Sequence, residues 1–305
     1  MNTGQHLLGP HVVGTRVVVR RVVPGEQGPT GGPALTDLLG ECVAWSSGAD
    51  GTCVVRPADG PDVEIALRDI VSGKPVPPRP SVRSRVTPEQ AQRHAFALFP
   101  DLVTEPVGSW VLRDSATATA RRAHSVLAFG PSGVEDDVAR VVAHYERPVA
   151  AVLTHSPEHE RLLSLGWVPE SRDGSTVFQV AGTAQVARAL RRGTTMSTTE
   201  PVLDEAVPGA WARAEIEGLA TGYAGFADDW VGFAGIEVSP TARRQGLGRA
   251  VMAALLDWGA EQGATTAYLQ VLDDNRPALA LYEALGFREH HRYCYLTTTA
   301  VSSAG

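Results

Sequence analysis

The segment from Val238 to Arg249 combines arginine and glycine in a spacing that can hold an anion. It reads Val-x-Pro-x-x-Arg-x-x-Gly-x-Gly-Arg and follows an apolar stretch, Trp230–Glu237. Glycines 246 and 248 allow a ligand to approach the backbone closely. A helix predicted to start here would present free N–H groups and the positive end of its dipole to a phosphate.

Two other phosphate-binding patterns are excluded at this position. The segment lacks the GxxxxGK[ST] of nucleotide triphosphate loops. Gly246-Leu247-Gly248-Arg249-Ala250-Val251 also lacks the third glycine of the dinucleotide fingerprint.

A second group of polar residues follows downstream. It comprises Asp274-Asn275-x-Pro277 and then Leu281-Tyr282-x-x-Leu285-Gly286-Phe287. Together with the glycine loop, these motifs resemble the Gcn5-related N-acetyltransferase (GNAT) superfamily: the loop is similar to its acetyl-CoA pyrophosphate loop, and the downstream residues to its second motif. The close resemblance covers about 217–296.

The resemblance implies roles for individual residues. Backbone amides of the loop would hold the pyrophosphate, a set made of Arg244, Gln245, Gly246, Leu247, Gly248 and Arg249, with Arg243 beside them. Backbone groups of Ile236 and Val238 would pair with the pantetheine arm and the thioester. Asn275 would bind pantetheine or cap its helix, and Tyr282 would protonate the departing CoA thiolate.

Each residue also has a structural interpretation. Asn275 before Pro277 is a favourable N-cap whether or not it meets a ligand, and Tyr282 fits the apolar spacing of a core helix. Glu237 is the candidate catalytic base, because it sits beside the cofactor strand, but strand alternation places it opposite Ile236 and Val238. It faces either the acceptor or solvent, so the base stays open.

The pattern of the remaining chain predicts the elements that position these residues. We expect a small all-β, SH3-like barrel in residues 1–72, with strands including 11–13 and 16–23 before a turn-rich stretch from Pro24 to Pro33. A proline-rich linker is expected over 73–86. Alternating helices and strands then predict an α+β or α/β fold, the mixed central sheet and flanking helices of the GNAT fold.

An internal repeat divides this second part. Ala151–Trp167 aligns with Val271–Phe287 as strand, loop, proline-started helix and Leu-Gly-aromatic. This favours a degenerate GNAT-like half over 87–185 and an acetyltransferase half with the acetyl-CoA site over 186–305. Leu162 stands where Tyr282 stands in the other copy, so we expect the first copy not to bind acetyl-CoA productively.

The composition limits the classes of protein to which this chain can belong. The 305 residues are 43% hydrophobic and 20% charged, with 27 Lys+Arg against 34 Asp+Glu and a net charge of -7. This is a globular composition without the basic excess of a general nucleic-acid binder. No signal peptide or membrane-length apolar run is visible, and three cysteines without CxxC spacing favour neither disulfides nor a metal site. We expect a cytoplasmic protein.

The sequence therefore predicts an enzyme that transfers acetyl from acetyl-CoA to a primary amine by direct attack, without a metal. The alternative is a non-catalytic acyl-CoA-binding regulatory protein that uses the barrel as an interaction module. A homodimer, or a protein partner held through the barrel, stays open, as does the acceptor.

Overall fold

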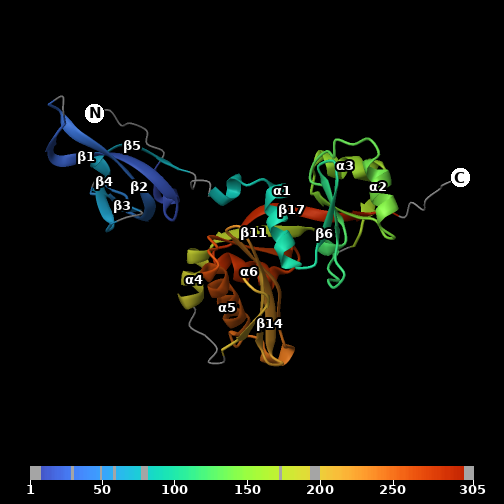
Figure 1. Cartoon of the computed structure of the whole chain (residues 1–305). Helices are drawn as coiled ribbons and strands as arrows, with labels where there is room; N and C mark the ends of the chain where they lie inside the picture. The colour runs from blue at the N-terminus through green and yellow to red at the C-terminus, as the bar shows by residue number, and fades with distance from the viewer. Residues whose placement is uncertain are drawn as a thin grey trace. The chain divides into compact units, whose positions relative to one another are not determined.

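The computed structural model describes most of the chain, and its contacts divide the chain into two compact units, Met1–Pro80 and Ser81–Gly305 (Figure 1). The described residues are 8–28, 31–48, 50–57, 60–76, 82–171, 174–192 and 200–298. Among them, no helix is long and apolar enough to cross a membrane.

The first unit is a five-stranded antiparallel sheet in the order β4-β3-β2-β1-β5. Its strands are β1 (Arg16–Gln27), β2 (Pro33–Trp45), β3 (Thr52–Pro57), β4 (Val63–Ala66) and β5 (Ile70–Pro75). Val17 and Val19 on β1 are fully buried while Arg20 is exposed, which is the alternation of a strand with one face on a core. The sheet's core also contains Cys42 and Cys53.

Three sequence expectations for this unit need correction. The predicted strand at 11–13 is a single 3₁₀ turn, Pro10–Val12, closed by the Val13 amide on the Pro10 carbonyl. Strand β1 continues through Pro24 to Gln27 instead of ending in a turn there, because it keeps pairing with β2 as far as Gln27↔Pro33. The predicted linker begins later than residue 73, since β5 pairs with β1 up to Pro75↔Val17.

The second unit is built on one twelve-stranded sheet, whose main path is β12-β13-β14-β15-β16-β11-β17-β9-β8-β7-β6. Its strands are β6 (Val103–Val107), β7 (Trp110–Asp114), β8 (Val126–Leu127), β9 (Val149–Leu153), β10 (Val168–Pro169), β11 (Thr176–Gly182), β12 (Val202–Val207), β13 (Trp211–Ile216), β14 (Ala220–Ala227), β15 (Trp230–Val238), β16 (Thr266–Leu272) and β17 (Arg288–Thr297). Its helices are α1 (Pro88–His94), α2 (Asp137–His144), α3 (Pro157–Ser164), α4 (Thr183–Arg192), α5 (Leu247–Glu261) and α6 (Arg276–Ala284). One-turn 3₁₀ segments lie at 82–85, 95–98, 121–123 and 240–242.

The two copies of the internal repeat start their helices in the same way. At α3, Ser156 Oγ accepts a bond from the His159 amide at 3.1 Å, and Pro157 follows. At α6, Asn275 Oδ1 accepts from the Ala278 amide at 3.2 Å, with Pro277 in the first turn. Both caps satisfy an N–H that has no partner within the helix.

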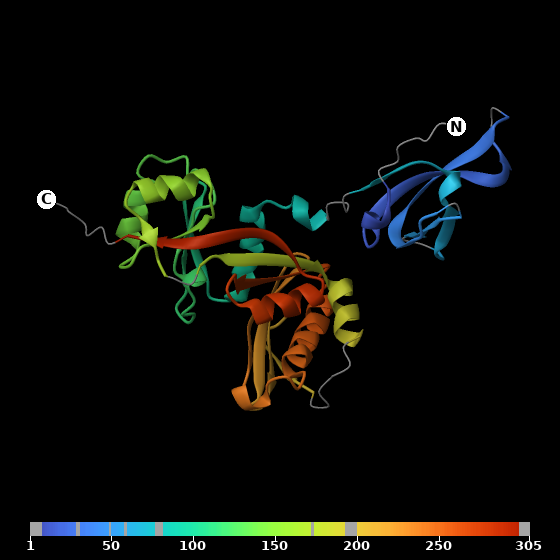
Figure 2. The same ribbon diagram turned by 180° about the vertical axis from the view of Figure 1, so that it is seen from behind.

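The last strands of the two repeats are exchanged. Strand β11, which ends the first copy, pairs with β16 of the second copy along its whole length. Strand β17, which ends the second copy, pairs with β9 of the first copy from Tyr293↔Leu153 to Thr297↔Val149. The two exchanged strands also pair with each other, and Figure 2 shows β17 (red) running beside β11 toward the first copy.

The elements without a clear counterpart in the sequence expectations include β6, α4, β12 and β13. The predicted division between residues 185 and 186 falls inside α4. Val186 and Leu190 of this helix belong to the same buried cluster as Val251 and Leu255 of α5. Because α4 packs on the second copy's helix, a domain boundary within it has no structural counterpart.

Candidate active site

The loop between β15 and α5 has the backbone of an anion site. Arg244 has φ +62° and Gly246, the N-cap of α5, has φ +79°, so the chain turns sharply before the helix begins. The Ala250 amide donates to the Gly246 carbonyl at 3.0 Å. The amides of Leu247, Gly248 and Arg249 precede that bond in the first turn, where an α-helix leaves N–H groups without internal acceptors.

Strands β15 and β16 diverge next to this loop. Their parallel pairing runs from Trp230↔Thr266 to Phe233↔Leu269 and stops there, although β15 continues to Val238. Beyond Phe233 no described strand pairs with β15 on the side of β16. The backbone groups of Ile236 and Val238 therefore lie at a free strand edge, where a ligand can form hydrogen bonds with them.

A β-bulge sets which side chains of β15 face α5. Thr221 pairs with Glu237 and Tyr223 pairs with Ala234, so the single residue between them on β14 opposes two on β15, Gly235 and Ile236. Gly235 takes φ +59°. Before the bulge Val231 and Phe233 face the α5 core, and after it Ile236 and Val238 do so. Glu237 is thereby turned to the opposite face of the sheet.

A cleft of about 930 Å³ opens at this strand end. Its lining includes the predicted residues Ile236, Glu237, Val238, Arg243, Arg244 and Asn275. The exposed arginines and the start of α6, with Pro277, Ala278 and Leu281, also line it. The lining thus combines basic and apolar side chains.

The other predicted loop residues are not among this lining, although Gln245 is exposed. Leu247 is buried, and a Cβ on Gly248 would come within 3.3 Å of Val238 Cγ2, so this glycine lets the helix pack closely on β15. Arg249 points away from the loop and donates to the Ala189 and Leu190 carbonyls of α4 at 2.9 and 3.2 Å. Only its backbone amide is suited to the predicted role.

Tyr282 is not among the residues that line the cleft. Its ring packs against the α5 core and against Phe287, at 5.9 Å between centroids. Burial raises the pKa of its phenol, so the hydroxyl keeps its proton at neutral pH. No hydrogen-bond partner of that hydroxyl occurs among the described residues.

The structure adds residues that the sequence analysis missed. Arg213, Glu215 and Thr221 line the cleft on the same sheet face as Glu237. The Arg213 guanidinium pairs with Glu215 at 2.9 Å, whereas Glu237 has no described partner. Alternation of small apolar and polar residues in 211–216 was a usable signal, since a strand of this pattern puts Arg213 and Glu215 on one face.

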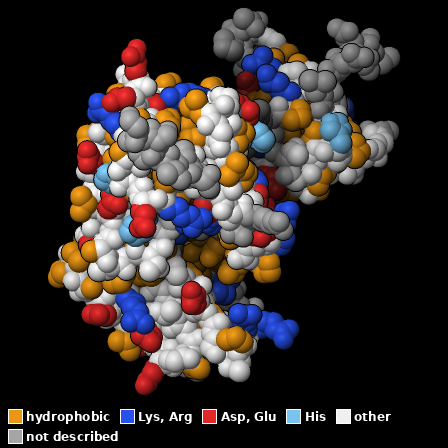
Figure 3. All heavy atoms as spheres, turned by 90° about the vertical axis from the view of Figure 1, so that its right-hand side faces the viewer, with side chains coloured by type: hydrophobic (Ala, Val, Ile, Leu, Met, Phe, Trp, Pro, Cys, Tyr) orange, Lys and Arg blue, Asp and Glu red, His pale blue; other side chains and the backbone are white. Residues whose placement is uncertain are grey.

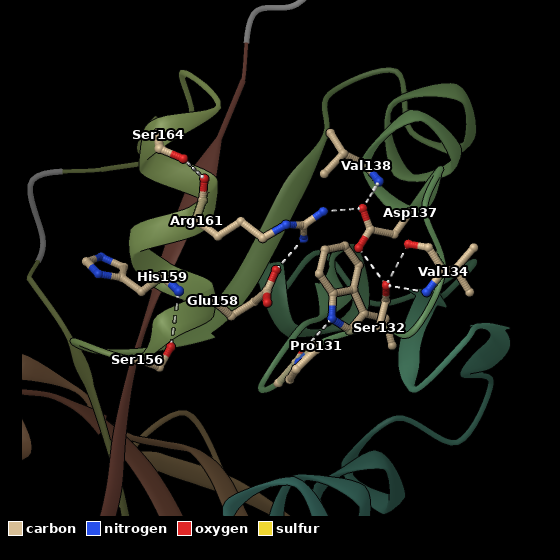
Figure 4. A network of polar contacts seen from close by, with 12 residues as sticks. Pro131, Ser132, Val134, Asp137, Val138, Ser156, Glu158, His159, Arg161 and Ser164 are labelled. Carbon is tan, nitrogen blue, oxygen red and sulfur yellow. Dashed lines mark hydrogen bonds and ion pairs between the residues drawn. The ribbon is translucent and has the colours of Figure 1, made fainter.

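In the first repeat copy, the helix N-terminus that corresponds to the start of α5 is occupied by a side chain of the protein itself (Figure 4). Asp137, at the start of α2, is 2% exposed. Its carboxylate accepts bonds from the Val138 amide at 2.6 Å, Ser132 Oγ at 2.6 Å and Arg161 at 2.7 Å. Burial alone would raise the pKa of Asp137, but these bonds outweigh it and lower the pKa.

This carboxylate supplies the negative charge that the N-terminus of a helix attracts. Arg161 is held in turn by Glu158. The first copy therefore uses its helix N-terminus for an internal ion pair. That this copy does not bind acetyl-CoA productively stays a prediction.

The described part of the chain contains no group of three or more His, Cys, Asp or Glu residues arranged to hold a metal ion. On the face drawn in Figure 3, acidic and basic side chains are interspersed and are not gathered into a single basic patch.

Comparison with known proteins identifies relatives of this chain. A curated relative, "Probable histone acetyltransferase Rv0428c" of Mycobacterium tuberculosis, is 27% identical over 286 residues, 88% of this chain and 91% of the relative. The "[Ribosomal protein bS18]-alanine N-acetyltransferase" of Escherichia coli is 48% identical over 54 residues, which are 18% of this chain and 36% of that enzyme. A solved "GCN5-related N-acetyltransferase from Kribbella flavida" aligns with a TM-score of 0.48 and 18% identity, over 73% of this chain and 98% of that one.

The family described as "Probable histone acetyltransferase Rv0428c C-terminal" matches residues 89–296, which span both repeat copies. This chain belongs to that family of acyltransferases, within the GNAT superfamily.

Proposed function

We propose that the protein transfers acetyl from acetyl-CoA to a primary amine, of a small molecule or of a protein, by direct attack. The observation that carries this proposal is the divergence of β15 and β16 beside the first turn of α5. The amides of 247–249 and the exposed Arg243 and Arg244 suit a pyrophosphate. The open edge of β15 suits a pantetheine arm, which carries amide groups able to pair with a strand.

Each residue of the proposed site has a separate role in this mechanism. Amides near the bulge would polarise the thioester carbonyl, and Tyr282 would donate a proton to the CoA thiolate. Glu237 is proposed as the group that accepts a proton from the amine, because its carboxylate is unpaired on the cleft side of β15. Asn275 caps α6 through Oδ1, and its Nδ2 remains available to pantetheine.

The test is acetyl-CoA binding by calorimetry, with the intact protein and with Gly246→Glu. A glutamate at the N-cap would bring a carboxylate into the phosphate position, as Asp137 does in the first copy. Gly263→Glu is the matched control, because Gly263 also has positive φ (+100°) but follows the other end of α5 in open space. We expect loss of binding in Gly246→Glu alone. Equal binding by the two variants, or none by the intact protein, would reject the site.

We also propose that the first unit is an SH3-like barrel and that the protein is cytoplasmic. The barrel is supported by β1, which pairs with both β2 and β5 and so brings the last strand back to the first. The cytoplasm is supported by Cys42 and Cys53, whose sulfurs lie 3.8 Å apart without a disulfide.

A further inference from the structure

A second cavity, of about 270 Å³, adjoins the point where β15 and β16 separate. It is lined by Ala120, Arg121, Arg122, Thr176, Gln270, Leu272 and Tyr295. Gln270 directly follows Leu269, the last residue of β16 that pairs with β15. A larger cavity of about 510 Å³, which Asp273 also lines, shares Arg121, Thr176, Leu272 and Tyr295 with it. We call the smaller cavity the hollow.

Arg122 brings a positive charge into this hollow without a compensating carboxylate. Its side chain is partly buried, and its Nε is buried with no hydrogen-bond partner. The titratable groups that face it include Tyr293, Tyr295 and Tyr223, which are phenols and neutral at pH 7. No Asp or Glu among the described residues forms an ion pair with it.

The neighbouring arginines increase this positive charge. Arg113 is 3% exposed and is bonded to the Ser125 carbonyl and hydroxyl at 3.0 and 2.8 Å, not to a carboxylate. Burial lowers the pKa of Arg113, and the charge of Arg122 adds to this shift. The nearby Glu170 is engaged by Arg121 at 2.6 Å and by Arg147 at 2.8 Å.

Gln270, which lines the same cavity, has a second donor atom without an acceptor, in addition to Nε of Arg122. Its Oε1 accepts from the Tyr293 hydroxyl at 2.6 Å and from Gln92 Nε2 at 3.4 Å. With Oε1 engaged in these contacts, Nε2 of the same amide is buried and has no hydrogen-bond partner among the described residues. A buried donor left without an acceptor is costly unless a ligand supplies one.

We infer that this hollow binds the acceptor, and that the acceptor is an amine that carries its own carboxylate, as an amino acid does. The carboxylate would pair with the Arg122 guanidinium and accept from Gln270, which would direct the amine toward the diverging strands. This inference rests on the proposed acetyl transfer. It differs from an expectation based on the net charge of -7, which by itself favours a cationic acceptor.

The first experiment measures stability without any ligand. In Arg122→Met the uncompensated charge is replaced by an apolar chain of similar length, so we expect the melting temperature to stay the same or rise. If Arg122 instead serves the fold through an ion pair, its loss lowers the melting temperature, and the inference is wrong.

The second experiment measures binding to the CoA-loaded protein, with N-acetylglycine as the carboxylate probe and N-acetylglycinamide as its neutral counterpart. We expect only the carboxylate to bind at millimolar concentrations. Arg122→Met should weaken it on the order of 10- to 100-fold, the value of a hydrogen bond to a charged group. Arg122→Lys should retain part of the affinity, and the exposed Arg188→Gln on α4 should retain all of it.

The outcomes separate this inference from the proposed function. If acetyl-CoA does not bind, the proposed function fails. If it binds, but the two probes bind equally, neither binds, or Arg122→Met binds as well as the intact protein, only the carboxylate subsite is rejected.

Discussion

One carboxylate distinguishes the two helix N-termini that the repeat places in equivalent positions. In the first copy Asp137 turns back onto the amide of Val138 and is held by Ser132 and Arg161. In the second copy the corresponding turn contains Gly246, Leu247 and Gly248, none of which has a side chain able to reach the amides. A single acidic side chain therefore decides whether such a site is filled internally or stays open to a ligand.

Tyr282 is the residue whose proposed role is most easily separated from its packing. In Tyr282→Phe the ring keeps its contact with Phe287, but the proton donor is gone. We expect kcat to fall about 100-fold or more, measured as CoA release with a saturating amine, while acetyl-CoA affinity is unchanged.

The pH dependence offers a second check on Tyr282. Because burial raises the pKa of this phenol above its ordinary value of 10.0, the acid form persists throughout the neutral range. Its deprotonation should reduce the rate only above about pH 10. An unchanged kcat in the phenylalanine variant would make Tyr282 a packing residue.

At the scale of elements, the bulge in β15 changes the direction of every side chain that follows it. Ordinary alternation would continue the face of Val231 and Phe233 to Glu237. The extra residue instead directs Ile236 and Val238 to the core and leaves Glu237 on the cleft face. Gly235 makes this possible, because its φ of +59° is a conformation that other residues adopt at a cost.

Gly235→Ala tests the bulge. A Cβ there would lie 2.5 Å from Tyr223 Cε1, and the positive φ adds strain. We expect a loss of about 1–3 kcal/mol in the free energy of unfolding, measured in denaturant, together with weaker acetyl-CoA binding.

The matched control for the bulge is Gly133→Ala, which has φ +76° but open space around its Cβ. It should show a smaller loss, from the backbone alone, and normal acetyl-CoA binding. Equal stability losses and normal binding in both variants would mean that the bulge does not shape the cleft.

At the scale of the whole molecule, the exchange of β11 and β17 makes the two repeat copies one folding unit. Residues 186–305 alone would lack β11, which fills the space between β16 and β17. They would also lack Val177 and Ala181 from the α5 core. Exposed strand edges and a missing part of the core both favour aggregation.

We therefore expect residues 186–305 expressed alone not to show a cooperative unfolding transition by circular dichroism. The comparison is residues 81–305, which contain both copies and should unfold cooperatively and bind acetyl-CoA. A stable, acetyl-CoA-binding 186–305 fragment would contradict the importance of the exchanged strand.

The sequence by itself determined the local chemistry of the candidate site. Arg243, Gly246 and Gly248 lie in a short-range pattern, and Asn275 and Pro277 specify a helix start, because caps and tight turns depend on a few adjacent residues. The start of helix α5 was predictable for the same reason. The repeat was visible because both copies keep the same order of strand, cap and helix.

Only the tertiary structure decided what those elements face. The exchange of β11 and β17 leaves no local signal, because the partners of each strand lie far away in the chain. The β15 bulge depends on Gly235 opposite Gly222 of another strand. The absence of an ion pair at Arg122 among the described residues is likewise set by the fold. Such effects arise from contacts between residues far apart in the chain, which local patterns do not encode.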